Sequence, residues 1–426
     1  MATPKIVPVH LPNLAPRWRL VLLLACAAAL NYADRAAFSS VLPPLRQDLG
    51  LSDATLGLLG SLFLWSYALA SPFAGAIADR FPRRTLVLVS LATWSAVTAA
   101  TGLATGVISF AFLRIALGVA ESLYLPAAIA LLADHHDTTT RGRALSIHSL
   151  GLNCGVVLGG AFAGYSAQHF GWRTGFLVLG IVGVGLALFA RRRIPIAPTP
   201  VGATPSSSAH PPVRTALRYL SRVPSFYVLL LKTMLAGFSI WIFLNWLPLY
   251  FNEAFHMSLG AAGFAGTFML QISTMIGIAG GGWISDWVAK RDPRSRMLVM
   301  ALSYSCAAPF LLLFTTRPGF GIVVLAVSAF SFLRGLGEAS EKPCLCDVVP
   351  ACYRSTALGL MNTLATAAGG LGVLLAGLLK RDWGLETVFA ASSGVFVIAG
   401  LCLFAGYRWF LPRDIARATA TAAAAR

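Results

Sequence analysis

The chain has 426 residues, of which 57% are hydrophobic and only 12% are charged, and its mean hydropathy is +0.73. Soluble domains carry roughly 25% charged residues, so this composition excludes an ordinary soluble protein and indicates a multi-pass membrane protein. The net charge of +17 does not indicate a nucleic-acid partner, because the basic residues lie in short segments between apolar stretches.

Apolar stretches of about 20 residues recur along the chain and predict an all-α membrane protein. The first stretch is too long for a signal peptide and has no small-residue cleavage site after it, so it counts as a span. With both termini on one side, roughly 23 of the 33 Lys and Arg lie on that side, which predicts cytoplasmic termini. The twelve predicted spans are residues 18–40, 54–78, 85–104, 107–132, 142–166, 173–191, 225–250, 261–285, 297–316, 319–345, 355–379 and 387–410.

One segment, from Arg191 to Ser225, is rich in Pro, Ser and Thr and is too polar to cross a membrane. It predicts a cytoplasmic linker at 191–224, in which TALRYLSR forms a short interfacial helix. Six predicted spans precede the linker and six follow it. We therefore expect an N-terminal six-helix half at 1–190 and a pseudo-symmetric C-terminal half at 225–426.

Two pairs of similar segments support an internal duplication. GAIADRFPRR after the second span and GWISDWVAKR after the eighth have Gly and Asp at the same offsets. FAFLRIALGVAES in the fourth span is similar to FSFLRGLGEASE in the tenth, but two registers are open there. One register matches Arg114 with Arg334, and the other, two helical turns away, matches Asp134 with Asp347.

Charged residues inside the predicted spans are the first candidates for function, because a charge at mid-membrane costs from about 3 to more than 10 kcal/mol. Two interpretations are open: ion pairs that only fix the packing, or a site for a substrate and protons. Arg114 and Glu121 lie two turns apart on one helix face with Gly118 between them, which allows another helix or a ligand to approach. The charged candidates are Asp34, Arg35, Arg114, Glu121, Lys232, Arg334, Glu338, Glu341 and Lys342.

The motif NYADR places an acid beside a base in the first span. Asp34 and Arg35 are about 100° apart around a helix, so we expect one to face the fourth span and the other to face a central cavity. If Arg35 pairs with Glu121 in the empty state, protonation of Glu121 frees the guanidinium for an incoming carboxylate, and Asp34 is a second proton site. Two acids and two bases that nearly neutralise one another favour a cavity that holds an anion and a proton alternately.

Uncharged polar residues inside the spans are the next candidates for substrate contact, namely Tyr67, Asn153, Asn245, Gln271 and Asn362. The roles of His148, and of Arg334, Glu338 and Glu341 in the tenth span, are open between substrate contact, gate and packing. The chain has no Ser/His/Asp set, phosphate-binding loop or zinc motif, so the sequence predicts neither an enzyme nor a cofactor or metal site.

The motifs together resemble the major facilitator superfamily over all twelve spans. GAIADRFPRR is similar to its signature loop, and GWISDWVAKR is similar to the weaker second copy of that loop. The resemblance implies that Asp79, Arg83 and Asp286 brace the cytoplasmic gate of a transporter. NYADR, WSYAL, R-x-x-x-G-x-x-E in the fourth span, GWR and WLPLYFNEAFHMS resemble the anion:cation symporter group, which includes transporters of sugar acids and organic phosphates.

This second resemblance implies that Asp34 and Glu121 couple protons and that Arg35 and Arg114 bind the substrate anion. We expect proton-coupled uptake of a small organic anion by a monomer in the bacterial inner membrane, with the substrate held between the two halves. Spinster-type lipid transporters have similar motifs, so export of a lipid or drug is the alternative, and a membrane sensor is a third. Ser71 stands where sugar-acid transporters typically have Gln.

Overall fold

The computed structural model describes residues 16–137, 139–194, 213–316 and 318–424, and these residues form helices joined by short loops. The helices before the predicted linker are α1 (Pro16–Ser40), α2 (Leu42–Leu49), α3 (Asp53–Arg80), α4 (Arg83–Thr101), α5 (Val107–Ser122), α6 (Tyr124–His135), α7 (Arg141–Phe170) and α8 (Trp172–Arg193). The later elements are α9 (Val213–Leu220), α10 (Pro224–Phe255), α11 (Leu259–Ala289), α12 (Ser295–Leu312), η1 (Leu313–Thr316), α13 (Phe320–Glu338), α14 (Glu341–Val348), α15 (Ala351–Ala405), η2 (Gly406–Phe410) and α16 (Leu411–Ala424). The short helix predicted before the seventh span is present as α9, while residues 195–212 of the predicted linker lie outside the described residues.

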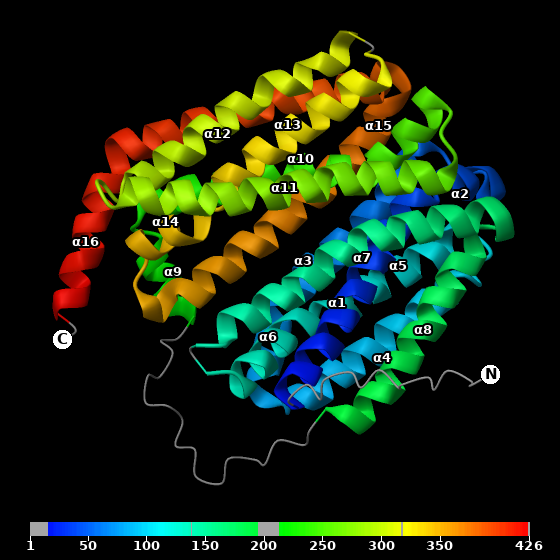
Figure 1. The fold of residues 1–426 in the computed structure, drawn as a ribbon, viewed down its shortest axis with the longest axis horizontal. Helices are drawn as coiled ribbons and strands as arrows, with labels where there is room; N and C mark the ends of the chain where they lie inside the picture. The colour runs from blue at the N-terminus through cyan, green and yellow to red at the C-terminus, as the bar shows by residue number, and fades with distance from the viewer. Residues whose placement is uncertain (1–15, 138, 195–212, 317, 425–426) are drawn as a thin grey trace, which may run out of the picture.

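The two sets of helices lie side by side (Figure 1). Helices α1–α8, here called the N-terminal group, occupy the lower right of the view, and α9–α16, the C-terminal group, lie to the upper left. Between the groups, α3 packs on α15 and α7 packs on α11. Ten helices in the described part of the chain are long and apolar enough to cross a membrane. One of them, Ala351–Ala418, contains a break at Gly384, where φ is 74° and ψ is 158°.

Two of the predicted spans, 107–132 and 319–345, are each divided into two helices. The first breaks at Leu123, between α5 and α6, and the second breaks after Glu338, between α13 and α14. A proline lacks the N–H group and its ring clashes with the carbonyl group four residues earlier, which disfavours an unbroken helix. Pro126 and Pro343 each lie about four residues beyond these breaks, so both breaks have a local cause.

Glycines on α7 bring this helix into close contact with α1. A Cβ atom added at Gly155 would lie 2.1 Å from the carbonyl oxygen of Ala29, and one added at Gly159 would lie 2.3 Å from the Cα atom of Ala33. Helices in lipid gain little from hydrophobic burial against each other, so close packing of small residues supplies much of their association. This contact fixes the position of the NYADR segment of α1.

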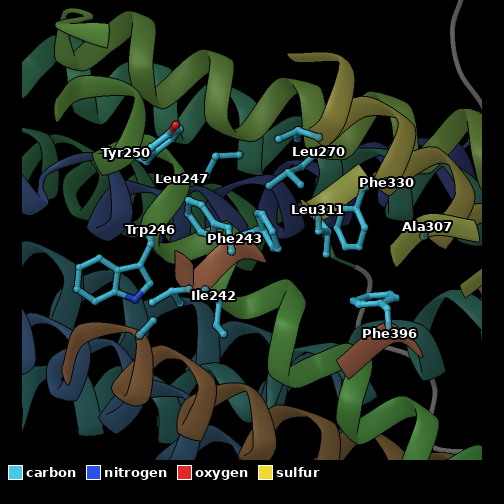
Figure 2. Packing of buried hydrophobic residues seen from close by; sticks show 14 of the residues in the cluster. Ile242, Phe243, Trp246, Leu247, Tyr250, Leu270, Ala307, Leu311, Phe330 and Phe396 are labelled. Carbon is cyan, nitrogen blue, oxygen red and sulfur yellow. The ribbon is translucent and has the colours of Figure 1, made fainter. Parts of the chain in front are cut away.

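Aromatic rings fill the core of the C-terminal group (Figure 2). The ring of Phe243 on α10 stacks on that of Phe389 with 4.6 Å between centroids, and lies 5.3 Å from that of Phe330. Phe330 in turn meets Phe396 edge-on at 4.8 Å. Such pairs contribute about 0.5–1.5 kcal/mol each beyond the area they bury. They hold α10, α13 and α15 together, and these helices carry the polar residues discussed below.

Matching ion pairs at the helix ends favour one of the two open registers of the repeat. In the N-terminal group, Arg83 at the start of α4 pairs with Asp134 near the end of α6. In the C-terminal group, Arg296 at the start of α12 donates to Asp347 near the end of α14 at 2.8 Å. The same pair of side chains on corresponding helices supports the register that matches Asp134 with Asp347.

Candidate functional site

An ion pair between α1 and α5 forms the centre of the candidate site. Nε of Arg35 donates to Oε2 of Glu121 at 2.8 Å, and Nη2 of Arg35 donates to the side-chain oxygen of Asn31 at 3.2 Å. The two charged side chains are 9% and 0% exposed, so the pair is buried. The second carboxylate oxygen of Glu121 is also buried and has no hydrogen-bond partner among the described residues. The contact predicted between Arg35 and Glu121 is therefore present.

Three aromatic rings surround the Arg35 guanidinium. Its carbon lies 4.5 Å from the ring centroid of Tyr32, 4.8 Å from that of Tyr67 and 5.1 Å from that of Phe63. The faces of aromatic rings attract cations, and they leave the hydrogen-bonding edge of the guanidinium free to meet oxygen atoms. Tyr67 therefore supports Arg35, although Tyr67 itself does not line the central cavity.

A second guanidinium, that of Arg114 on α5, lies in the same region without a carboxylate partner within the described part of the chain. Its Nε donates to the carbonyl oxygen of Leu59 at 3.3 Å, and its carbon lies 4.3 Å from the ring centroid of Phe38. Gly118 explains how α5 comes this close to α3, because a Cβ atom there would lie 2.5 Å from the carbonyl oxygen of Phe63. Arg114 is 3% exposed, so its charge is buried without an ion-pair partner among the described residues.

Asp34 points in a direction that the sequence did not predict. Its Oδ2 accepts a hydrogen bond of 2.9 Å from Thr98 of α4, and its Oδ1 is buried and has no partner in the described part of the structure. We expected one of Asp34 and Arg35 to face the fourth span and the other to face the cavity. Instead, Arg35 does both, because it contacts Glu121 and also lines the cavity. Asp34 itself does not line the cavity.

A cavity of about 350 Å³ lies between the two groups of helices. Residues from α1, α3, α5 and α7 line it on one side, and residues from α10, α11 and α13 line it on the other. Arg35 and Arg114 lie in its wall, together with three of the predicted contact residues, Asn153, Gln271 and Asn245. Gln271 of α11 donates to the side-chain oxygen of Asn153 of α7 at 2.9 Å, which links the two groups. Predicted contacts at Tyr67 and Asn362 fall outside the lining, and Asn362 is exposed.

The charged residues of the tenth predicted span have two separate positions. Arg334 and Glu338 pair with each other on α13, and both line the cavity. Glu341 lies outside the cavity lining and pairs with Lys232, whose side chain is 1% exposed. The Lys232 ammonium also lies 4.9 Å from the ring centroid of Tyr304. The first pair therefore belongs to the candidate site, and the second belongs to the packing of α10 against α12 and α14.

His148 has a packing position. Its Nε2 lies 3.2 Å from the hydroxyl of Tyr124, which donates to the carbonyl oxygen of Leu24 at 2.6 Å. The imidazole is 2% exposed and lies outside the cavity lining. These contacts join α1, α6 and α7 and give His148 no access to a substrate in this state.

Two of the three predicted gate residues have described ion pairs. Arg83 pairs with Asp134, and Asp286 lies 3.5 Å from Arg296 with its own side chain 74% exposed. Asp79 is in the last turn of α3, and its side chain lies outside the described part of the structure.

A cluster of four charges at one end of the molecule was missed by the sequence analysis. Arg46 of α2 donates to Asp53 at the start of α3 at 3.1 Å and to Glu253 near the end of α10 at 2.9 Å. Lys380 of α15 donates to the same two carboxylates at 3.1 and 3.0 Å. We call these residues the four-charge cluster. Lys380 directly follows the predicted span 355–379 and lies in a short charged segment, so nothing in the sequence singled it out or identified its partners.

The GWR motif forms a second polar contact at the same end. Arg173 donates to Asp48 of α2 at 2.5 Å, and the Trp172 indole donates to the same oxygen at 3.1 Å. These two hydrogen bonds lower the pKa of Asp48 from its usual value. The motif therefore fixes the short helix α2, which carries Arg46. No group of three or more His, Cys, Asp or Glu side chains with the geometry of a metal site occurs in the described ranges.

Comparison with known proteins identifies the family of this chain. Residues 24–345 match the model of the Major Facilitator Superfamily. The chain is 27% identical to the hexuronate transporter of Bacillus subtilis (strain 168), over 91% of this chain and 92% of that protein. It is 27% identical to the chloroplastic sodium-dependent phosphate transport protein 1 of Arabidopsis thaliana, over 90% of this chain and 77% of that protein.

Solved structures show the same fold. A bacterial homolog of the human lysosomal transporter Spinster, in an inward-facing and unoccupied conformation, superposes with a TM-score of 0.80. It covers 94% of this chain and 99% of that chain, at 21% sequence identity, so this likeness concerns the fold alone. The family match, the relatives and the apolar helices together show that the chain is a multi-pass membrane transporter, not an enzyme, and that it belongs to the Major Facilitator Superfamily.

Proposed function

We propose that the protein couples the uptake of a small organic anion to the entry of protons across the inner membrane of a bacterium. The observation that carries this proposal is the buried Arg35–Glu121 pair in the wall of a central cavity, beside the guanidinium of Arg114, which has no carboxylate partner among the described residues. Anion transporters among the relatives support the substrate class. A cavity that presents several guanidinium groups does not suit an apolar lipid or drug, which disfavours the export alternative.

Exchange of partners at Arg35 would couple the two fluxes. While Glu121 is ionised, its carboxylate occupies the guanidinium of Arg35 and competes with any anion. When Glu121 takes up a proton, the guanidinium becomes free, and a substrate carboxylate accepts two parallel hydrogen bonds from it. Arg114 then adds a second attraction on the same wall. Asp34 is the second proton site in this proposal, and Thr98 holds its carboxyl group in place.

The described helices support twelve spans in two halves. Ten helices satisfy the length and hydropathy that a span requires. The break at Gly384 divides the longest of them into two, and α4 adds a nineteen-residue helix of the N-terminal group. Twelve spans give six before the linker at 191–224 and six after it, so the two groups would be halves of residues 1–190 and 225–426 that rock against each other.

We further infer that this conformation is closed on the outer side and that both termini are cytoplasmic. Helix α10 starts at Pro224 beside the linker, and Glu253 of the four-charge cluster is near its far end. The cluster therefore joins the two groups at the end opposite the linker. The pairs at the linker end, Arg83 with Asp134 and Arg296 with Asp347, each lie within a single group. The excess of Lys and Arg on the linker side supports a cytoplasmic location for that end.

Three substitutions in proteoliposomes test the proposal. Arg35→Ala should raise the Kd for the substrate anion by about 30-fold or more, because truncating one partner of a buried charge pair costs about 2–5 kcal/mol. Arg35→Lys should restore little, since an ammonium group does not reproduce the paired hydrogen bonds. Glu121→Gln imitates the protonated state, so it should bind substrate and exchange it in counterflow. It should no longer accumulate substrate in response to a pH gradient. In the wild-type protein, each coupled proton should raise the ratio of inside to outside substrate concentration by about tenfold per pH unit.

The exposed carboxylate of Asp382 provides a matched control, because Asp382→Asn makes the same chemical change outside the cavity and should accumulate substrate normally. Normal pH-driven accumulation by Glu121→Gln would refute proton coupling at this site. In that case the Arg35–Glu121 pair would be a packing contact.

A further inference from the structure

We propose that one end of the C-terminal group carries a docking surface for the headgroups of anionic phospholipids. The surface consists of residues 213–227 and 406–418, which form α9, the first turn of α10, η2 and the start of α16. Helices α9 and α16 lie at the left of Figure 1. The surface is separate from the central cavity, so its test does not depend on the transported substrate. We call it the basic collar, after the arginines that it exposes: Arg214, Arg218, Arg222, Arg408, Arg413 and Arg417.

Helix α9 carries three rows of side chains next to one another around its circumference. Residues four apart lie on the same side of a helix, one turn from each other. Ala216 and Leu220 form the first row and are buried against the body of the protein. Val213 and Leu217 form the second row, which is apolar and yet 64% and 44% exposed. The second row therefore needs a cover that the described part of the chain does not provide.

The third row of α9 consists of Arg214 and Arg218, which are exposed beside the apolar row. On the remaining side, Tyr219 stacks on Tyr353 of α15 with 4.8 Å between ring centroids, so the rotation of the helix is fixed. A helix in the membrane interface places apolar side chains among the acyl chains and basic side chains at the headgroups. A soluble acidic partner would use only the basic row, so the two rows together favour a lipid.

Exposed aromatic side chains mark the same level on the neighbouring elements. Trp409 of η2 is 62% exposed, and Phe410 of η2 and Tyr227 of α10 are also exposed. A Cβ atom added at Gly406 would lie 2.8 Å from the side chain of Val228, so η2 packs on α10 next to Tyr227. Trp and Tyr are enriched where membrane proteins meet the lipid headgroups. These rings therefore place the collar at the headgroup level.

Two polar contacts hold α16 against the segment between α9 and α10. The backbone N–H of Ser225 donates to Oδ2 of Asp414 at 2.8 Å, and Arg417 donates to the carbonyl oxygen of Arg222. Asp414 is buried, and its charge interacts favourably with the N-terminus of α10. Arg413, one turn before Arg417, is exposed. The two helices therefore present their arginines on one continuous surface.

The charge of the collar is strongly one-sided. Its residues include six arginines and one acid, the buried Asp414. The turn after α11 is different, because residues 286–296 include four basic residues and two acids. There, Arg294 pairs with Asp292, and Arg296 pairs with Asp286. Each basic residue near an anionic leaflet strengthens binding by about fivefold, so the collar should attract anionic headgroups more than this balanced turn does.

Lipid selection by the purified full-length protein tests the proposal. The protein would be equilibrated with equal amounts of phosphatidylglycerol and phosphatidylcholine that have the same acyl chains, and native mass spectrometry would give the ratio of the two bound lipids. The wild-type protein should prefer phosphatidylglycerol, and the preference should fall as the ionic strength rises. Arg214→Gln combined with Arg218→Gln should lower the preference by about 5- to 25-fold, because two charges at the headgroups are lost.

Two further double variants provide the controls. Lys290→Gln with Arg291→Gln removes the same amount of charge from exposed positions in the balanced turn, and it should change the lipid ratio by less than about twofold. Arg214→Lys with Arg218→Lys keeps both charges and should retain the preference. Retention by the lysine variant separates a loss of charge from a folding defect.

Three outcomes would overturn the proposal. The wild-type protein could bind both lipids equally, or the two double glutamine variants could lose the preference equally, and in either case the collar is not a distinct lipid site. A lysine variant that loses as much as the glutamine variant would show that headgroup charge is not recognised. Binding of inorganic polyphosphate that depends on Arg214 and Arg218, and that phosphatidylglycerol does not displace, would assign the collar to a soluble polyanion.

Discussion

The four-charge cluster provides a direct test of which end of the cavity is closed. Lys380 is the best residue to change, because its ammonium donates to both Asp53 and Glu253 while its side chain is only 10% exposed. Lys380→Met keeps the length of the side chain and removes the charge. The two carboxylates keep Arg46 as a partner, so the helices should still fold and pack.

The contacts set the size of the expected effect. Each of the two ion pairs made by Lys380 is partly buried, so the pairs together should contribute about 1–3 kcal/mol to the closed arrangement. The cluster joins α2 and α3 to α10 and α15, and these contacts separate when the outer end opens. Their loss should therefore shift the equilibrium toward the outward-open state by about 5- to 150-fold.

Accessibility of the cavity from outside the cell measures this shift. In a protein without other cysteines, Ser39→Cys places a thiol in the cavity wall, and a membrane-impermeant reagent should label it faster after Lys380→Met. Arg381→Met removes a neighbouring exposed charge and should leave the labelling rate unchanged. If Lys380→Met labels no faster than the parent protein, or if both variants accelerate labelling equally, the cluster is not the outer gate.

Three further predictions concern other parts of the molecule. A cysteine introduced by Ser221→Cys, at an exposed position after α9, should resist an impermeant thiol reagent in intact cells, and rapid labelling would reverse the proposed orientation. Asp79→Asn should slow transport while substrate binding persists, and loss of binding would show that the signature loop has another role. Gly118→Val should lower the free energy of unfolding by about 1–3 kcal/mol, because the added side-chain atoms would clash with the backbone of α3. Gly185→Val, where nothing lies within 4 Å, should be neutral in the same melting assay.

The sequence predicted the central ion pair because two strong constraints act on it. A charge inside a span must find a partner, and helical periodicity places Arg114 and Glu121 on one face of one helix. Arg35 had few possible partners in the first four spans, so its pairing with Glu121 followed from a short list. The helices themselves were predicted for a similar reason, since a membrane requires long apolar segments.

Features that depend on the packing of distant helices could not be predicted. The direction of Asp34 depends on the rotation of α1 against α4, which a single helix does not define. Prolines gave an ambiguous signal: Pro126 accompanies a break, but Pro248 lies inside the unbroken helix α10. The partners in the four-charge cluster are far apart in the chain. A charged residue in a loop also contributes to the orientation of the protein in the membrane, so the sequence does not show that these charges pair with one another.

The two similar halves of the chain carry opposite charges at one matched position of the repeat. The register that matches Asp134 with Asp347 also matches Glu121 with Arg334, because each pair is separated by the same number of residues. The ion pairs at the helix ends are the same in both groups, as expected if both brace a gate. At the level of the cavity the matched position has a carboxylate in one group and a guanidinium in the other. A carboxylate can release a proton during the cycle, whereas a guanidinium stays charged throughout. On the proposed mechanism the N-terminal group therefore senses the proton, and the C-terminal group contributes a constant attraction for the anion.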